Sequence, residues 1–344
     1  MKLHKTIPVD EAVGMVLPHD VTRIDKTDGF KGRAFRKGHI IREEDIPGLK
    51  DLGKENIYVL ELTPDDIHEN EAARLLAIAL AGPGAEVNGE PVEGKLNIVA
   101  RTDGLLRIDV AALHQFNLVG EVMCATLHHN TPVKKGLQIG ATRLIPLIGK
   151  RKTVEEACAI AGNVGGIIRV AQLPNLKAGL VITGNEVYHG RIKDAFEPVL
   201  RKKLTDLGSE VVAVRFAPDD IKAIAAEIRT CLDRGAEIII TSGGMSVDPD
   251  DVTRQGIKEA GAGAMVYGTP VLPGAMFLVA YLDKVPILGL PACGMFHKTT
   301  VFDLVLPRLM LGEKIGRDEL AAMGHGGLCR QCKSCSYPVC DFGK

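Results

Sequence analysis

From residue 178 onward, short apolar runs alternate with amphipathic stretches. The short runs have the length and composition of buried strands, and they lie at 178–183, 211–216, 237–241, 276–281 and 285–290. Between them, apolar residues recur three or four positions apart, which predicts helices, the last of them over about 296–311. Strands that alternate with helices are typical of a doubly wound, mostly parallel α/β sheet. We therefore predict that fold class for this part of the chain.

The pattern before residue 176 is less regular and predicts smaller mixed α+β and β-rich modules. A helix is expected to begin at Thr63 and to end at the turn that starts with Gly82. Residues 85–150 alternate β-type runs with turn signals, and a capping box of Thr153 and Glu156 predicts a helix after them. These changes divide the chain into an N-terminal α+β segment (1–84), a β-rich module and connector (85–175), the α/β domain (176–315) and a Cys-rich tail (316–344).

Composition narrows the classes of function. The formal net charge is −1, from 42 basic and 43 acidic residues, whereas a general binder of nucleic acid or anionic membrane would carry a basic excess. Hydrophobic residues make up 46% of the chain, which excludes disorder, and the lack of Trp points to an aliphatic core. The N-terminus has no apolar signal core, and no long apolar stretch follows. We therefore expect a cytoplasmic protein without nucleic-acid or membrane partners.

In a sheet of the predicted kind, ligands bind beyond the carboxyl ends of the strands, so the loops there are candidates for the site. The loop after the third strand is the most informative. Its glycines Gly243 and Gly244 allow backbone N–H groups to approach an anion closely, while Ser242 and Ser246 add hydroxyl donors. This chemistry suits a phosphate group.

Acidic residues crowd the same loop. Asp248, Asp250 and Asp251 would repel a phosphate unless a cation lay between them, and Mg²⁺ binds carboxylate and phosphate oxygens together. Further acids in the neighbouring loops complete the rim: Glu186, Asp194 and Asp219. Alternatively, Asp250 or Asp251 only caps the following helix, but capping explains one aspartate and leaves the Gly-Gly-x-Ser pattern unexplained.

The segments TGNEVYHGRIKDAF and IIITSGGMSVDPDDVT resemble the molybdopterin-binding domain of molybdenum-cofactor biosynthesis proteins. The later YGTPVLPGAMF and VPILGLP narrow the likeness to the molybdopterin molybdotransferase (MoeA-like) branch, which the E-domain of gephyrin also resembles. This resemblance implies a homodimer that inserts molybdate into adenylated molybdopterin with Mg²⁺ and releases AMP. It covers about Ala178–Leu311. A weaker likeness covers Ala12–Leu60.

The resemblance and the chemistry of the loops together assign roles to individual residues, and nine of these match the family motif: Thr183, Gly184, Glu186, Asp194, Ser242, Gly243, Gly244, Ser246 and Asp251. Those expected to bind the cofactor are Thr183, Gly184, Asn185, Asp194, Ser242, Gly243, Gly244, Ser246, Asp248 and Asp250. Those expected to take part in catalysis are Glu186, Asp219 and Asp251. Three departures count against catalysis: Asp248 replaces a glycine, the turn Pro273-Gly274-Ala275-Met276 lacks a lysine, and Pro291-Ala292-Cys293-Gly294 lacks an asparagine.

Two other functions stay open. One is a molybdopterin-binding or delivery module that has lost catalysis and docks a molybdoenzyme partner through the tail. The other is the related competence-damage-type pyrophosphatase branch, which ranks lower because it usually carries the domain at its N-terminus with a GGLGPT-like loop. A basic segment, Lys26–Arg42, either is a solvated face or faces an anion across a dimer.

The tail contains four cysteines within twelve residues: Cys329, Cys332, Cys335 and Cys340. Four thiolates at this spacing suit either a tetrahedral Zn²⁺ ion or an iron–sulfur cluster, with His325 as an alternative ligand. The other reading is a flexible tail of free thiols or disulfides, which a cytoplasmic setting disfavours. The remaining four cysteines are scattered singly and are expected to be reduced packing residues.

Overall fold

The computed structural model describes residues 5–24, 31–59, 63–245 and 251–344. The chain forms two compact units. The first contains Met1–Thr102, Leu106–Leu127 and Val133–Val170, and the second contains Asp103–Leu105, His128–Pro132 and Ala171–Lys344. No helix among the described residues is long and apolar enough to cross a membrane.

The second unit is built on a six-stranded sheet of order β15-β14-β16-β19-β18-β17. Four strands are parallel: β14 (Lys177–Thr183), β15 (Glu210–Ala217), β16 (Ile238–Ser242) and β19 (Val285–Leu290). Two antiparallel strands complete it, β17 (Gly263–Tyr267) and β18 (Leu278–Leu282). This confirms the predicted α/β, mostly parallel sheet, whereas β17 was not predicted.

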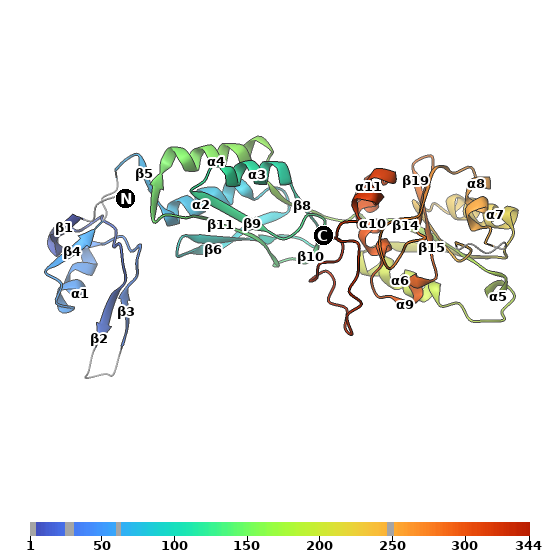
Figure 1. Cartoon of the computed structure of the whole chain (residues 1–344), viewed down its shortest axis with the longest axis horizontal. Coiled ribbons are helices and arrows are strands. Elements are labelled where there is room, and N and C mark those ends of the chain that lie inside the picture. The colour runs from blue at the N-terminus through green and yellow to red at the C-terminus, as the bar shows by residue number, and fades with distance from the viewer. Residues whose placement is uncertain (1–4, 25–30, 60–62, 246–250) are drawn as a thin grey trace. The chain divides into compact units, whose positions relative to one another are not determined.

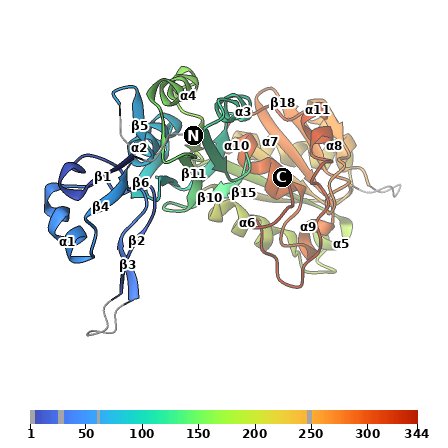
Figure 2. The ribbon, with the colours of Figure 1, turned by 60° about the vertical axis from the view of Figure 1, so that its left-hand side comes forward.

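Helices cover both faces of this sheet (Figures 1 and 2). Along β14, Leu180 and Ile182 pack into a core with α6 (Phe196–Asp206) and α10 (Val301–Met310). Val181 points into a second core with α7 (Ile221–Asp233) and α8 (Thr253–Glu259). Because successive side chains of a strand point to opposite faces, one continuous apolar run supplies both cores.

The last apolar stretch of the unit does not form one helix. Instead α9 (Cys293–Phe296) ends before α10, and the Thr300 side chain accepts a hydrogen bond from the Phe302 backbone at the start of α10. Asp303 closes the capping box on the Thr300 N–H. This capping box sets the start of α10 at Val301, a helix boundary that the apolar pattern does not reveal. After α11 (Arg317–Ala322) the described chain forms turns and extended segments.

The first unit contains small sheets. Strands β1 (Lys5–Pro8) and β4 (Asn56–Val59) pair, with η1 (Val9–Glu11), η2 (Glu43–Asp45) and α1 (Ile46–Asp51) between them in sequence. Other pairs are β2 (Val21–Ile24) with β3 (Lys31–Phe35), and β5 (Asp66–His68) with β12 (Ile148–Lys150). A four-stranded sheet joins β6 (Ala85–Val92), β7 (Lys95–Ala100), β11 (Gln138–Leu144) and β9 (Val122–Thr126).

Three helices pack with this four-stranded sheet in one apolar core: α2 (Glu69–Leu80), α3 (Val110–Leu118) and α4 (Arg151–Asn163). A further sheet has the order β10 (Pro132–Val133), β8 (Gly104–Ile108) and β13 (Ile168–Ala171). The core is aliphatic, as the composition predicts, and Phe116 is its one fully buried aromatic side chain among the described residues.

Three local predictions in the first unit are wrong. Thr63 does not begin a helix, because its N–H and hydroxyl bond to Asp66, which lies in strand β5. Helix α4 begins at Arg151, before the expected capping box. The third error is an omission: helix α3 was not predicted, and it fills the stretch between two expected β-type runs, where Asp109 accepts a hydrogen bond from Ala112 and caps it.

Candidate functional site

The candidate site lies where the order of the parallel strands reverses. From β14 the chain crosses to β15 on one side and then returns to β16 on the other side of β14. The carboxyl ends of β14 and β16 therefore border a crevice of the kind in which such sheets bind ligands. A pocket of about 760 Å³ lies there, with Thr183, Gly243 and Gly244 in its wall. This volume suits a small-molecule ligand.

The two glycines of this wall are required by the fold. Gly243 and Gly244 have φ of +89° and +55°, in the left-handed region that favours glycine. A Cβ atom on Gly243 would lie 2.4 Å from the Thr183 carbonyl oxygen, and one on Gly244 would lie 2.3 Å from the Thr253 hydroxyl oxygen. The turn after β16 therefore packs directly on β14 and on the start of α8.

Hydroxyl groups join these three segments. The Thr183 hydroxyl lies 2.9 Å from both the Ser242 carbonyl oxygen and the Thr253 hydroxyl oxygen. Ser242 is fully buried, and its own hydroxyl has no hydrogen-bond partner within the described part of the chain. Ser242 is therefore not among the residues that line the pocket. Its predicted contact with a ligand would have to be made by its backbone atoms.

Three of the predicted acids line the pocket: Glu186 on α5 (Asn185–Tyr188), Asp194, and Asp251. The Asp194 carboxylate also accepts the backbone N–H groups of Phe196 and Glu197, at 2.9 and 2.8 Å, and so caps α6. Lys193 is the one basic residue among the described residues of this wall. The wall is therefore acidic, as the sequence predicts.

Asp219 lies outside the wall. Its carboxylate accepts the Asn185 backbone N–H at 2.9 Å, and the Asn185 side chain accepts the Asp219 N–H at 3.2 Å. This reciprocal pair fastens the start of α5, just after Gly184, to the end of β15. Asp219 and Asn185 are therefore positioning residues for Glu186. The predicted ligands Ser246, Asp248 and Asp250 lie outside the described residues.

The apolar side of the pocket was not predicted. It is formed by side chains from five separate segments: Ile192, Met245, Leu272, Met276, Met295 and Leu328. The Tyr267 hydroxyl donates to the Met245 carbonyl oxygen at 2.6 Å, and the Arg254 guanidinium lies 4.3 Å from the centre of the Tyr267 ring. These contacts anchor the chain on both sides of residues 246–250. No local sequence signal links such scattered apolar residues.

Both turns that depart from the family pattern border this pocket. Ala275 and Met276 stand in one, and Ala292 and Cys293 stand in the other. Partial burial raises the pKa of the Cys293 thiol, so this side chain stays a neutral thiol at neutral pH. The pocket therefore lacks the lysine and asparagine that the resemblance would supply.

The four tail cysteines line a second pocket, of about 520 Å³. All eight cysteines of the chain are free thiols. Across residues 5–24, 31–59, 63–245 and 251–344, no three or more His, Cys, Asp or Glu side chains are gathered as ligands of a metal ion. The predicted metal site is thus not preformed, and His325 lies in another pocket.

Comparisons with known proteins agree with the placement of the site. Residues 179–311 match the family described as a probable molybdopterin binding domain, and residues 6–61 match a domain of unknown function (DUF8806). Among curated proteins, a CinA-like protein of Mycobacterium avium is 39% identical over 77 residues, which are 22% of this chain and 18% of that protein. One of Mycolicibacterium gilvum is 40% identical over the same shares. The chain thus spans less than a fifth of these relatives.

Solved structures that match this chain in part include a MoaB molybdopterin biosynthesis enzyme from Thermus thermophilus, at 23% identity, covering 40% of this chain and 98% of that chain with a TM-score of 0.34. A molybdopterin biosynthesis MoeA protein from Pyrococcus horikoshii is 14% identical and covers 90% of this chain and 74% of that chain, also with a TM-score of 0.34. Residues 179–311, which match a probable molybdopterin binding domain, supply most of the wall of the pocket at the strand ends.

Proposed function

We propose that this protein binds adenylated molybdopterin in the pocket at the strand ends and promotes Mg²⁺-dependent insertion of molybdate, with release of AMP. One observation carries the proposal. The two motifs of the molybdopterin-binding domain, which are about sixty residues apart in sequence, both contribute to the wall of one pocket of ligand size. The homodimer and the use of molybdenum are parts of the same proposal.

The chemistry of the wall fits a phosphate that is bound with a cation. Glu186 and Asp251 line the pocket, and a phosphate beside them would be repelled without a compensating positive charge. Mg²⁺ would be held by these carboxylates, and when bound it withdraws charge from a phosphoanhydride. Asp219 acts indirectly, by holding Asn185 and the start of α5 that carries Glu186. The glycine turn and Thr183 would face the phosphate.

The apolar side of the pocket would hold the uncharged part of the ligand. Met245, Leu272 and Met276 offer adaptable apolar contacts for a flat ring system. Together with the acidic side, this gives the mixed wall that orients a small ligand.

A second candidate function is binding and delivery without turnover. The observation that favours it is the pair of turns in which Ala275 and Cys293 stand where the family pattern has lysine and asparagine. These side chains remove a positive charge and an amide from the pocket. In this version the ligand is bound and passed to a molybdoenzyme partner.

One assay separates the two functions. Purified protein is given adenylated molybdopterin, molybdate and Mg²⁺, and AMP release and ligand binding are both measured. For the enzyme we expect turnover that falls roughly a hundredfold in Asp251→Ala, because a cation ligand is lost. The matched control is Asp206→Ala, an exposed acid on α6 that pairs with Lys202.

The assay has three distinguishable outcomes. AMP release that depends on Asp251 supports the molybdotransferase. Tight binding without AMP release supports the delivery module and overturns the enzyme. If neither adenylated nor free molybdopterin binds, both functions are wrong.

A further inference from the structure

The four cysteines of the tail line a single pocket, although they are spread over twelve residues. We propose that this pocket is a binding site for a metal centre held by the thiolates of Cys329, Cys332, Cys335 and Cys340, either a zinc ion or an iron–sulfur cluster. Both centres take four sulfur ligands, and the experiment below distinguishes them. The proposal does not depend on the function of the molybdopterin-binding domain.

The tail is a closed lobe and not a loose end. The Cys329 N–H donates to the Leu272 carbonyl oxygen at 2.8 Å, and the Leu272 N–H donates to the Gly327 carbonyl oxygen at 2.8 Å. At the other end, the Gly343 N–H donates to the Gly326 carbonyl oxygen at 2.9 Å. The residues between these anchors are therefore held as a loop against the second unit.

This lobe packs on the apolar core of the second unit. Phe342 is buried in that core, Cys329, Tyr337 and Cys340 pack against it, and the Phe342 ring lies 6.5 Å from that of Tyr337 in an edge-on contact. Residues 329–344 form no helix or strand. A segment without secondary structure gains stability from a metal crosslink, and four cysteines can supply one.

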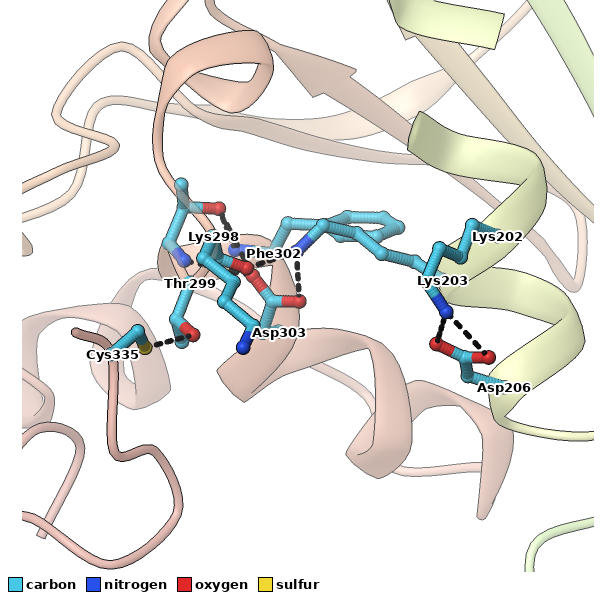
Figure 3. Close-up of polar contacts among 9 residues, drawn as sticks. Lys202, Lys203, Asp206, Lys298, Thr299, Phe302, Asp303 and Cys335 are labelled. Carbon is cyan, nitrogen blue, oxygen red and sulfur yellow. Dashed lines mark hydrogen bonds and ion pairs between the residues drawn. The ribbon is translucent and has the colours of Figure 1, made fainter. Parts of the chain in front are cut away.

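The opposite wall of the pocket comes from the segment between α9 and α10, which includes Lys298 and Thr299. The Cys335 Sγ lies 3.4 Å from the Thr299 hydroxyl oxygen (Figure 3). That hydrogen bond holds the Cys335 side chain against the segment before α10, so this thiol is positioned in the wall of the pocket.

The segment that faces Cys335 is held by neighbouring helices. The Asp303 carboxylate of α10 forms an ion pair with Lys203 of α6 and accepts the Thr300 N–H at 2.8 Å (Figure 3). Lys203 also donates to the Lys298 carbonyl oxygen at 2.7 Å. The segment that faces Cys335 is thus held in place by α6 and α10. Lys298 gives this segment a positive charge.

Binding requires a limited closure of the lobe. The thiols line one pocket but are not gathered as ligands within the described chain, and Cys332 is exposed whereas the other three are half-buried. An ion pair of Arg330 with Asp341, at 3.7 Å, already brings the flanks of Cys329 and Cys340 together. Because the intervening residues form only turns, the remaining movement breaks no helix or strand. A metal would supply the energy for it.

The first measurement is the metal content of the full-length protein, purified without oxygen. We expect one zinc ion or one iron–sulfur cluster for each chain. Elemental analysis and visible absorption distinguish them, because only the cluster absorbs visible light. Metal-free, reduced protein is then titrated with Zn²⁺ alone, and thiols that react with a thiol reagent are counted. We expect four thiols to become protected together.

The matched variants are Cys332→Ser and Cys158→Ser. Cys332 is exposed, so its loss should leave the fold intact, while Cys158 is a half-buried thiol of helix α4 in the first unit. We expect Cys332→Ser to weaken Zn²⁺ binding by more than about tenfold, since even indirect partners of a metal site contribute that much. Cys158→Ser should leave it unchanged.

Three results would overturn the proposal. One is that neither metal copurifies and that Zn²⁺ protects no thiols. Another is a metal that Cys332→Ser and the double variant Cys332→Ser/Cys335→Ser retain with unchanged affinity. The third is that the four tail cysteines of the protein purified without oxygen are joined as disulfides, which leaves no thiolates for a metal. Circular dichroism checks that each variant is folded.

Discussion

At the scale of single residues, the glycine turn after β16 is the most constrained part of the candidate site. Its two glycines have positive φ, and a Cβ on either would approach β14 or α8 to less than 2.5 Å. Both the fold and the proposed ligand contact therefore require glycine at positions 243 and 244. Glycines at this point hold the wall of the pocket in shape whether or not a phosphate is bound.

We expect Gly243→Ala to lower the free energy of unfolding by about 2 kcal/mol or more, because it adds both an unfavourable φ and a clash with the Thr183 carbonyl group. Chemical denaturation measures this. The matched control is Gly235→Ala, which has φ +81° but nothing within 4 Å of the new Cβ, and should cost only about 1 kcal/mol. Equal losses in the two variants would mean that the clash is relieved by relaxation.

Other predicted residues have a structural task as well. Asp194 caps α6, and Asp219 holds the Asn185 backbone. The sequence motif alone cannot separate such positioning residues from those that touch a ligand, since both are acids at strand ends. The hydrogen-bond partners distinguish them.

At the scale of helices and strands, the alternating pattern of the second unit predicted its elements well. Strands β14, β16 and β19 are almost wholly buried because both of their faces are covered, whereas the edge strand β15 is only partly buried. The covering helices α6, α7 and α10 each bury an apolar face. In the second unit the pattern missed β17 and the break before α10. Other errors arose in the first unit, where short elements begin at hydrogen bonds that the pattern does not reveal. The Thr63–Asp66 contact is one such case, because it looks like a helix cap but ends at a strand.

Helix α2 is capped by His68, a residue whose protonation state depends on pH. His68 precedes the helix, and its Nδ1 accepts the Asn70 N–H at 3.2 Å, while its Nε2 lies 2.7 Å from the Gly38 carbonyl oxygen. Only a neutral imidazole with its proton on Nε2 satisfies both contacts. Burial lowers the pKa of His68 below its usual value near 6.5, which agrees with the neutral form.

This arrangement sets the sign of a pH effect. As the pH falls below about 6.5, the unfolded chain takes up a proton at His68 before the folded chain does, so the unfolded state is favoured. We expect stability to decrease from that pH down to the lowered pKa of the folded state, and this part of the decrease to be absent in His68→Gln. The measurement is denaturation at several pH values, taken as the difference between the two proteins. A decrease that is identical in both would assign it to other groups.

At the scale of the whole molecule, the tail is part of the second unit and borders its ligand pocket. Leu328 lies in the wall of the pocket at the strand ends, and Gln331 lies in the walls of both that pocket and the cysteine pocket. A movement of the lobe would therefore change the wall of the ligand pocket at Leu328 and at Gln331. These two residues offer a physical basis for coupling between the two proposed sites.

We expect removal of the metal with a chelator to weaken molybdopterin binding by about fivefold or more, the lower end of typical coupling between two sites. Reconstitution with the metal should restore the affinity. Calorimetry or fluorescence measures binding to both forms. The same chelator should have little effect on the double variant Cys332→Ser/Cys335→Ser, which lacks two of the four proposed thiolate ligands. Equal affinities with and without metal would show that the lobe is independent of the pocket.

The sequence by itself determined the features that depend on neighbours along the chain. These are the α/β alternation of the second unit, the Gly-Gly turn that follows a strand, the acidic loops and the spacing of the four cysteines. Only the tertiary structure decided which of these features meet. In the folded chain Ser242 is buried, and Asp219 accepts a hydrogen bond from the Asn185 backbone. Met245, Leu272 and Leu328 line one apolar wall of the pocket. The reason is that a pocket wall is set by distances between segments far apart in sequence, which local periodicity does not encode.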